Sequence, residues 1–371
     1  MSLFHDFFSL KTLFVVMFTI QTVAWLGAEK GYMNARIQSR KRRERRPSLN
    51  SKPVRFSVIV AVKNEEQHIS SLLKCLTGQT LAPVEIIIVD DHSTDQTAAI
   101  TRKWQNGNTF IKLISSQGNG KKAALETGIK TAGSDVCAFT DADCLPPETW
   151  LERHALYHQE GSESVVVGFS PLTTQASFLG LAQRFDVEIS QLMAASAIGN
   201  KVAYAATGRN LSYSTSLFEK VGGFERHKHT LSGDDDLLIQ DIRSQTDAAF
   251  YWDDSAEIAV ESAAPSTWKD WLVQKRRHAS DGRQFIRDVK ISQSIFYLAL
   301  IGPWAIIATD FTMLFFMAPL IIAFQWYAMW DAHKMMGKRW SFWWLPVLSP
   351  WFALYSLIVP ITGHLNPPRT W

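Results

Sequence analysis

Two largely apolar runs, each ending in a polar cluster and followed by a helix-like segment, constrain the fold of this chain most strongly. The first run, residues 55–62, ends at Asn64, a favourable helix N-cap, after which apolar residues recur at helical spacing. The second run, residues 84–89, ends at Asp90 and Asp91, and another helix start follows. Strand, helix, strand and helix in this order predict a parallel sheet with right-handed crossovers.

Acidic side chains follow directly where these predicted strands end. Glu65, Asp90 and Asp91 all occupy such positions, and open α/β sheets bind ligands beyond the carboxyl ends of their strands. Turn and cap chemistry accounts for residues 93–95. Two adjacent carboxylates at the end of a buried strand are better explained by hydrogen bonds to the donor groups of a base or a ribose.

A third short strand, residues 135–140, leads into the pair Asp141 and Asp143. Alternate residues near a strand end can both turn toward one ion, and Mg²⁺ or Mn²⁺ prefers carboxylates together with substrate phosphates. Two solvated loop aspartates are the alternative. We favour the metal site, and we expect no role for Cys144 in it because such a site needs hard oxygen donors.

A glycine-containing segment, residues 118–125, places Lys121 at a helix start. Phosphate contact by this ammonium group is the functional interpretation, and an exposed turn is the alternative. Further along, Gly208 interrupts a strand-like run, which indicates close approach of another group to the backbone.

Three consecutive aspartates, Asp234 to Asp236, open a predicted helix after Gly233. One or two acidic residues in a first turn complement the helix dipole. Three exceed that need, so we expect one to be a positioned general base. Residues 267–278 then combine tryptophans with Lys275, Arg276 and Arg277, which fits a helix on the membrane surface, pyrophosphate binding, or both.

Uncharged segments at both ends predict membrane attachment. Residues 12–28 approach the roughly 20 residues that a spanning helix needs, and a retained anchor is favoured over a cleaved signal peptide. Residues 295–330 contain Asp310 as their one charge and are long enough for two spans, and a third covers about 342–362.

Basic segments next to these spans predict the orientation. Residues 40–46 and the loop 331–339 are both basic, and both favour a cytoplasmic location for the large domain, with the first also able to contact anionic headgroups. The net charge of +3 comes largely from such juxtamembrane blocks and gives no indication of nucleic-acid binding. The three cysteines lie in the presumed cytoplasmic domain, where a disulfide is not expected.

The order and spacing of these clusters resemble the family 2 inverting glycosyltransferases with a GT-A fold, in particular the membrane-embedded branch with cellulose, chitin and hyaluronan synthases. The resemblance covers about residues 54–280. Its four signatures are matched by Asp90-Asp91, Asp141-Ala-Asp143, Gly-Asp234-Asp235 and Gln274-x-x-Arg277, in that order. The last signature normally ends in Trp, and here the residue is His278, which makes processive polymer synthesis doubtful.

The resemblance implies a role for each matched residue. Asp235 is the expected catalytic base, and Asp143 with Asp141 the expected site of Mg²⁺ or Mn²⁺. The family likeness implies a uridine nucleotide-sugar as the donor. The residues expected to bind it are Glu65, Asp90, Asp91, Lys121, Asp141, Gln274 and Arg277. The candidate acceptor-side residues are Gly208, Asp234 and His278.

These inferences give one layout and one preferred function. We expect an anchor at 1–30, a basic linker at 31–53, the GT-A domain at 54–265, an amphipathic interfacial segment at 266–290 and about three spans in 291–371. The expected protein lies in a bacterial inner membrane and transfers single sugars to a lipid-linked or membrane-associated glycan acceptor. A processive polysaccharide synthase, a nucleotidyltransferase and an inactive membrane scaffold are the alternatives.

Overall fold

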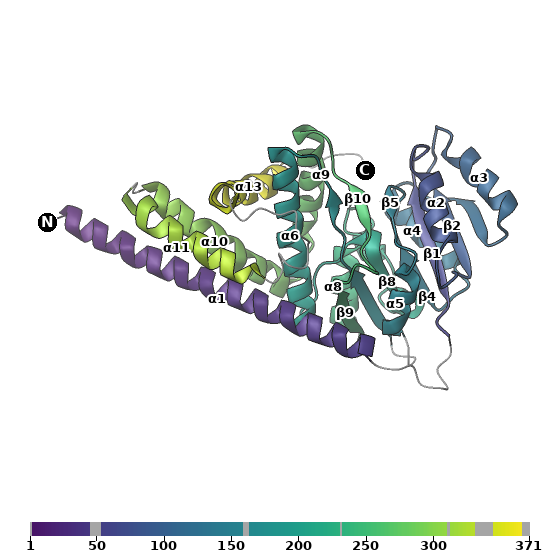
Figure 1. Cartoon of the computed structure of the whole chain (residues 1–371), viewed down its shortest axis with the longest axis horizontal. Coiled ribbons are helices and arrows are strands. Elements are labelled where there is room, and N and C mark those ends of the chain that lie inside the picture. The colour runs from purple at the N-terminus through teal and green to yellow at the C-terminus, as the bar shows by residue number, and fades with distance from the viewer. Residues whose placement is uncertain are drawn as a thin grey trace.

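The computed structural model describes residues 2–44, 53–158, 163–230, 232–309, 312–330 and 344–365. An α/β domain lies at one end and a group of long helices at the other, with the N-terminal helix running beneath both (Figure 1). The predicted turn at Asp310 and the predicted basic loop 331–339 lie outside the described residues.

The described residues of the α/β domain form a seven-stranded sheet in the order β3-β2-β1-β4-β8-β6-β9. Neighbouring strands are parallel except that β8 runs antiparallel to both β4 and β6. The strands of this sheet are β1 (Phe56–Val62), β2 (Glu85–Asp90), β3 (Ile111–Ser115), β4 (Val136–Phe139), β6 (Ser164–Gly168), β8 (Leu211–Ser214) and β9 (Ala249–Asp253). The predicted α/β class is therefore confirmed.

Helices cover the sheet on both faces, which explains why β1 is buried along its whole length and apolar except for Ser57. The α2 helix packs its buried leucines on one face, and α4 packs on the other so closely that a Cβ on Gly128 would lie 2.6 Å from Ile59 Cγ2. The helices of this domain are α2 (Ile69–Thr77), α3 (Thr97–Gly107), α4 (Lys121–Thr131), α5 (Trp150–His158), α7 (Thr215–Lys220) and α8 (Asp236–Gln245), with short 3-10 helices η1 (Gly208–Asn210) and η2 (Glu225–His227).

A small second sheet of the described residues flanks the main one, in the order β5-β10-β7. It consists of β5 (Cys144–Leu145), β7 (Leu172–Thr173) and β10 (Glu261–Ala263). Because β5 begins directly after Asp143, this sheet fixes the chain just beyond the paired aspartates.

The N-terminal helix α1 (Ser2–Glu44) is continuous, so residues 31–44 of the segment expected to be a linker are helical. It runs along α10 and α11, crosses α6 and ends against β9 (Figure 1). At the crossing the backbones are in close contact, and a Cβ on Gly199 would lie 1.9 Å from Gly31 O. The linker beyond Glu44 lies outside the described residues up to residue 52.

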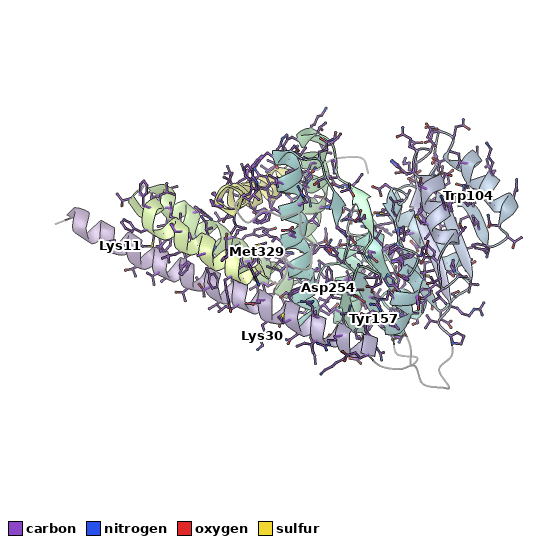
Figure 2. All side chains as sticks on the ribbon, in the orientation of Figure 1. Lys11, Lys30, Trp104, Tyr157, Asp254 and Met329 are labelled. Carbon is purple, nitrogen blue, oxygen red and sulfur yellow. The ribbon has the colours of Figure 1, made fainter. Side chains whose placement is uncertain are left out.

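Basic residues of α1 bind the α/β domain, although we expected this segment to be a basic linker. Arg36 pairs with Asp254 at 3.0 Å, and Arg43 pairs with Asp253 at 3.4 Å. Asp254 also accepts a hydrogen bond from Tyr32 at 3.1 Å and lies beside the C-terminal part of α1 (Figure 2). This end of α1 is therefore part of the folded domain.

Long helices connect the α/β domain to the apolar part of the molecule. They are α6 (Phe178–Gly199), α9 (Trp268–Ser280), α10 (Arg287–Thr309), α11 (Thr312–Ala328) and α13 (Leu345–Leu365), with η3 (Asp281–Arg283) between α9 and α10. Among the described residues, α1, α10 and α13 are long and apolar enough to cross a membrane, and the apolar part of α11 is shorter. The ring of Trp271 stacks on that of Tyr355 at 5.0 Å, which holds α9 against α13.

Candidate active site

Asp91 lies at the carboxyl end of β2 and is fully buried. Its Oδ1 accepts from the Gly120 backbone N at 3.0 Å, and its Oδ2 accepts from Lys63 Nζ at 3.1 Å. Burial alone would raise the pKa of Asp91, but these hydrogen bonds outweigh it and lower the pKa below its usual value. Asp91 therefore fastens the loop before α4 to the end of the strand.

The neighbouring Asp90 is more accessible. Its Oδ1 accepts from the Ser93 backbone N at 3.0 Å, and its side chain lines a pocket of about 330 Å³ together with Arg102 of α3 and Ser115 of β3. Of the two aspartates expected to bind the donor, Asp90 therefore faces this pocket, whereas Asp91 supports the backbone of the loop before α4.

Asp141, Asp143 and Cys144 form a candidate metal centre, because a ligand atom from each lies within 4.8 Å of the others. Cys144 is fully buried, and its Sγ donates to Asp143 Oδ1 at 3.5 Å. The carboxylate oxygens are thus the accessible ligands, and they are the type that Mg²⁺ and Mn²⁺ prefer. Glu65 lies nearby: burial raises the pKa of its carboxyl, His68 opposes this, and the charges of Asp143 and Asp141 raise it further.

Lys121, the first residue of α4, joins two of the predicted clusters. Its Nζ donates to Asp141 Oδ1 at 2.8 Å and lies 3.3 Å from Asp234 Oδ2. Burial disfavours the charged ammonium, but attraction to Asp141 and Asp234 outweighs it and raises the pKa of Lys121. This lysine brings the acidic pair after β4 and the acidic start of α8 into one site.

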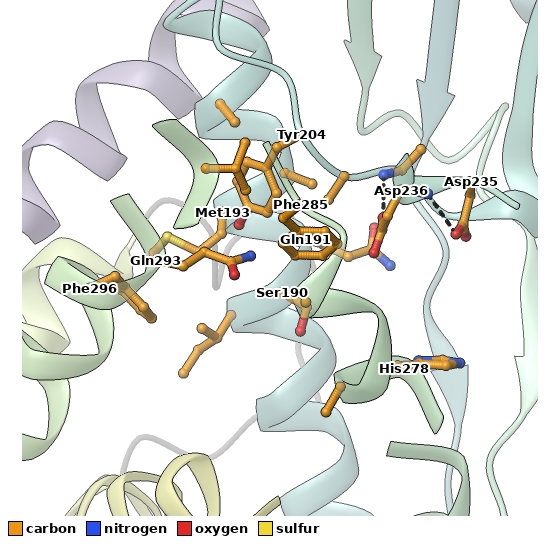
Figure 3. A pocket seen from close by; sticks show the side chains of 18 of the residues that line it. Ser190, Gln191, Met193, Tyr204, Asp235, Asp236, His278, Phe285, Gln293 and Phe296 are labelled. Atoms are coloured by element: carbon orange, nitrogen blue, oxygen red, sulfur yellow. Dashed lines mark hydrogen bonds between the residues drawn. The ribbon is translucent and has the colours of Figure 1, made fainter. Parts of the chain in front are cut away.

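Asp235 caps the N-terminus of α8 and also faces this site. Its Oδ1 accepts from the Asp236 backbone N at 2.8 Å (Figure 3), and its Oδ2 accepts from the Gly208 backbone N at 2.9 Å. Burial and then the charge of Asp234 raise the pKa of Asp235 to about 6, against the opposing effect of Lys121. A Cβ on Gly208 would lie 3.3 Å from Asp235 Oδ2, which explains the glycine in this turn.

The predicted basic segment on α9 forms the opposite wall, where Gln274, Lys275, Arg277 and His278 all line the same cavity. Lys275 is paired with Asp186 of α6 at 2.5 Å. His278 is exposed by accessible area although many protein atoms surround it; it lines the cavity and lies below Asp235 in Figure 3. Loss of hydration lowers the pKa of His278 well below its usual value, and the charges of Lys275 and Arg277 lower it further.

The cavity has a volume of about 1190 Å³ and extends from the acidic cluster to the long helices. Its far end is lined by Ala24 and Gly27 of α1, Phe296 of α10, and Tyr355 and Val359 of α13. One continuous space therefore joins the polar site to the apolar helices.

The structure brings most of the predicted site residues to this cavity. Those that line it are Lys121, Asp141, Gly208, Asp234, Asp235, Gln274, Arg277 and His278. Asp143 adjoins Asp141, whereas Glu65, Asp90 and Asp91 lie along the strand ends outside the cavity lining.

Sequence analysis missed two groups of cavity residues. Ser190 and Gln191 of α6 point into the cavity (Figure 3), and neither was among the predicted site residues. Arg209 also lines it. The available signal was that Arg209 is the one charged residue between positions 202 and 218.

Comparison with solved structures defines the class of fold. The chain superposes on the mannosyltransferase PcManGT from Pyrobaculum calidifontis, solved in complex with GDP-Man and Mn²⁺, with a TM-score of 0.59 and 17% sequence identity. The match covers 96% of this chain and 100% of PcManGT. The fold is thus the GT-A fold of nucleotide-sugar glycosyltransferases, as predicted.

Residues 57–222, a little less than half of the chain, match the model of Glycosyl transferase family 2 and form a family 2 glycosyltransferase domain. The chain is 31% identical over 197 residues to glycosyltransferase AglE of Haloferax volcanii, covering 52% of this chain and 62% of AglE. It is 28% identical over 294 residues to the probable glycosyltransferase YdaM of Bacillus subtilis, covering 76% of this chain and 66% of YdaM. The chain thus spans a little less than two thirds of the length of either relative.

Proposed function

We propose that this protein transfers a sugar from a nucleotide-sugar to a lipid-linked or membrane-associated glycan acceptor. The observation that carries the proposal is the cavity, which reaches from Asp235 and Lys121 to the apolar helices α1, α10 and α13. A polar head group can occupy the acidic end while an attached apolar chain lies between the helices. Such a shape suits an amphiphilic acceptor better than a small soluble one.

Asp141 and Asp143 would hold a divalent cation, Mg²⁺ or Mn²⁺. The fit rests on their paired carboxylate oxygens, which are accessible and can lie within 4.8 Å of each other. The bound ion would offset the charge that develops on the departing diphosphate. PcManGT, which shares the fold, was solved with Mn²⁺, which supports the choice of ion.

Asp235 would act as the general base. A carboxyl whose pKa is raised to about 6 is ionised at neutral pH yet basic enough to accept a proton in the transition state. As the acceptor hydroxyl oxygen bonds to the anomeric carbon, the carbon–oxygen bond to the diphosphate breaks and the hydroxyl proton moves to Asp235. Attack from the face opposite the leaving group inverts the anomeric centre.

The other predicted residues would bind the donor and the acceptor. Lys121 and Arg277 add positive charge near the diphosphate, and Gln274 lies beside Arg277 on the same wall. Glu65, Asp90 and the turn held by Asp91 would position the nucleoside. Gly208, Asp234 and His278 would border the acceptor hydroxyl.

We also propose single additions, with the catalytic domain on the cytoplasmic side of a bacterial inner membrane. The imidazole of His278 stands where polymer-forming relatives are expected to have Trp, and the few spans offer little wall for a polymer channel. A processive synthase is the second candidate, and the length of the product distinguishes the two. The basic end of α1 supports the cytoplasmic side.

The test is release of nucleoside diphosphate from a panel of sugar nucleotides by the detergent-purified protein, with Mg²⁺ or Mn²⁺ and then with EDTA. We expect metal-dependent release from one donor, and loss of that release in Asp143→Ala. Asp135→Ala, at the start of the same segment, is the matched control and should retain it. Release that persists in EDTA and in Asp143→Ala would contradict the metal site.

A further inference from the structure

Arg209 is the middle residue of the 3-10 helix η1, after Gly208 and before Asn210. Its guanidinium group lies in the wall of the cavity. Its Nη2 donates to Ser170 O at 2.8 Å, which fixes one edge of the group. Its Nε is buried and has no hydrogen-bond partner among the described residues. A buried donor of a charged group without a partner is costly, so its presence at a cavity wall favours a ligand there.

The turn that carries Arg209 is held by a buried polar network. Asn210 is fully buried, and its Nδ2 donates to Phe169 O and Ile258 O, each at 2.8 Å. Its Oδ1 accepts from Trp150 Nε1 at 2.9 Å. Arg209 is therefore positioned by the core before any ligand binds, as an anion-binding group requires for strong and specific contact.

Arg209 shares the cavity with a second unsatisfied guanidinium. Arg277 lines the same space, and its Nε is also buried without a hydrogen-bond partner in the part of the chain that the structure describes. Lys275, by contrast, is paired with Asp186. Both arginines therefore line the cavity that Asp141, Asp234 and Asp235 also line.

We propose that Arg209, together with Arg277, binds a phosphoryl group inside the cavity. Two guanidinium groups with free donors match a phosphoryl group, whose several oxygens can accept from both at once. The identity of that group rests on the proposed function: it is either the diphosphate of the donor or a phosphate on a lipid acceptor. The binding of the anion itself does not depend on transferase activity.

The experiment measures binding to the detergent-purified full-length protein in the presence of Mg²⁺. Inorganic pyrophosphate probes the anion site, UDP and GDP probe the donor side, and farnesyl phosphate compared with farnesol probes the acceptor side. We compare wild type with Arg209→Gln and Arg209→Lys. Arg226→Gln is the control, because Arg226 is largely exposed and paired with Asp241, away from the cavity lining.

Arg209→Gln should weaken pyrophosphate binding roughly 10- to 100-fold, as expected for loss of a charge-assisted hydrogen bond, and Arg209→Lys should restore part of it. An equal loss for UDP or GDP assigns the donor diphosphate. A loss for farnesyl phosphate, with farnesol unchanged, assigns a lipid phosphate. Thermal unfolding of each variant, within a few degrees of wild type, shows that the loss is local.

Pyrophosphate binding that is the same in wild type, Arg209→Gln and Arg226→Gln would overturn the proposal. Absence of pyrophosphate binding in wild type would also overturn it. A wild-type protein that binds pyrophosphate through Arg209 but binds neither UDP nor GDP would support the anion site and would argue against the proposed transferase function.

Discussion

Two groups of arginines in this protein differ in how their charge is balanced. At the end of α1, Arg36 and Arg43 pair with Asp254 and Asp253 of the α/β domain. In the cavity wall, the Nε groups of Arg209 and Arg277 are buried without a partner among the described residues. The first group is complete within the fold and holds two parts of the chain together. The second is complete only with a ligand, so a basic cluster gains functional meaning from its missing partners.

The largest effect should come from the acidic side of the cavity. Asp235→Asn removes the proton acceptor but keeps a side-chain oxygen for the N-cap, so kcat should fall about 10²- to 10⁴-fold. Nucleotide binding, measured by calorimetry, should change little. Asp254→Asn is the matched control in the α1 contact and should retain nearly all activity. Equal loss of activity and nucleotide binding in Asp235→Asn would make Asp235 a structural or ligand-binding residue.

Removal of one arginine from each group tests the comparison directly. Arg277→Gln should lower kcat/KM roughly 10- to 100-fold with little change in thermal unfolding, because it removes a charge that faces the ligand. Arg43→Gln should leave kcat/KM within a few-fold of wild type. The comparison fails if Arg43→Gln costs as much activity as Arg277→Gln.

The pH dependence of activity should follow Asp235. With its pKa raised to about 6, the carboxylate is protonated below that pH, and kcat/KM should decrease about tenfold per pH unit there. The stability contribution has the opposite sign, because the folded state binds this proton more tightly, so stability is lost as pH rises from 3.8 to about 6. If kcat/KM of Asp235→Asn still decreases at acidic pH in the same way as that of wild type, the pKa that controls activity belongs to another group.

The smallest effect on turnover and the clearest effect on stability should come from the α1 contact. Asp254→Ala removes the partner of both Arg36 and Tyr32, and we expect a destabilisation of about 1–2 kcal/mol. Chemical unfolding of the detergent-solubilised protein measures it. An Arg36→Gln variant combined with Asp254→Ala should be less destabilised than the two single changes added together, because the residues share one interaction.

The sequence predicted the parallel half of the sheet well, because the parts of strands β1 and β2 within residues 55–62 and 84–89 are buried on both faces and are therefore mostly apolar, with Ser57 and Glu85 as the polar residues. It did not predict that β8 lies between β4 and β6 in antiparallel orientation. That pairing joins segments far apart in the chain and depends on tertiary packing, which a local pattern does not contain.

The site was predicted in part for the same reason. Asp141, Asp234 and Asp235 follow strands or begin helices, so their positions could be inferred from local patterns, and the cavity brings them together. Which charged side chains have partners in the fold, and which have none, could not be inferred from the sequence. The partner of Arg36 is more than two hundred residues away in sequence, and the buried Nε of Arg209 becomes evident only when Asn210 and Ser170 are placed around it.

The continuous α1 helix has a mechanical consequence. It has no proline between residues 2 and 44 and, at 1.5 Å per residue, is about 65 Å long. One end is apolar enough to span a bilayer, and the other is clamped to β9 by ion pairs. With the proposed function, the helix would act as a rigid strut that sets the height of Asp235 above the lipid, and an acceptor would be selected by how far its hydroxyl group projects from the membrane.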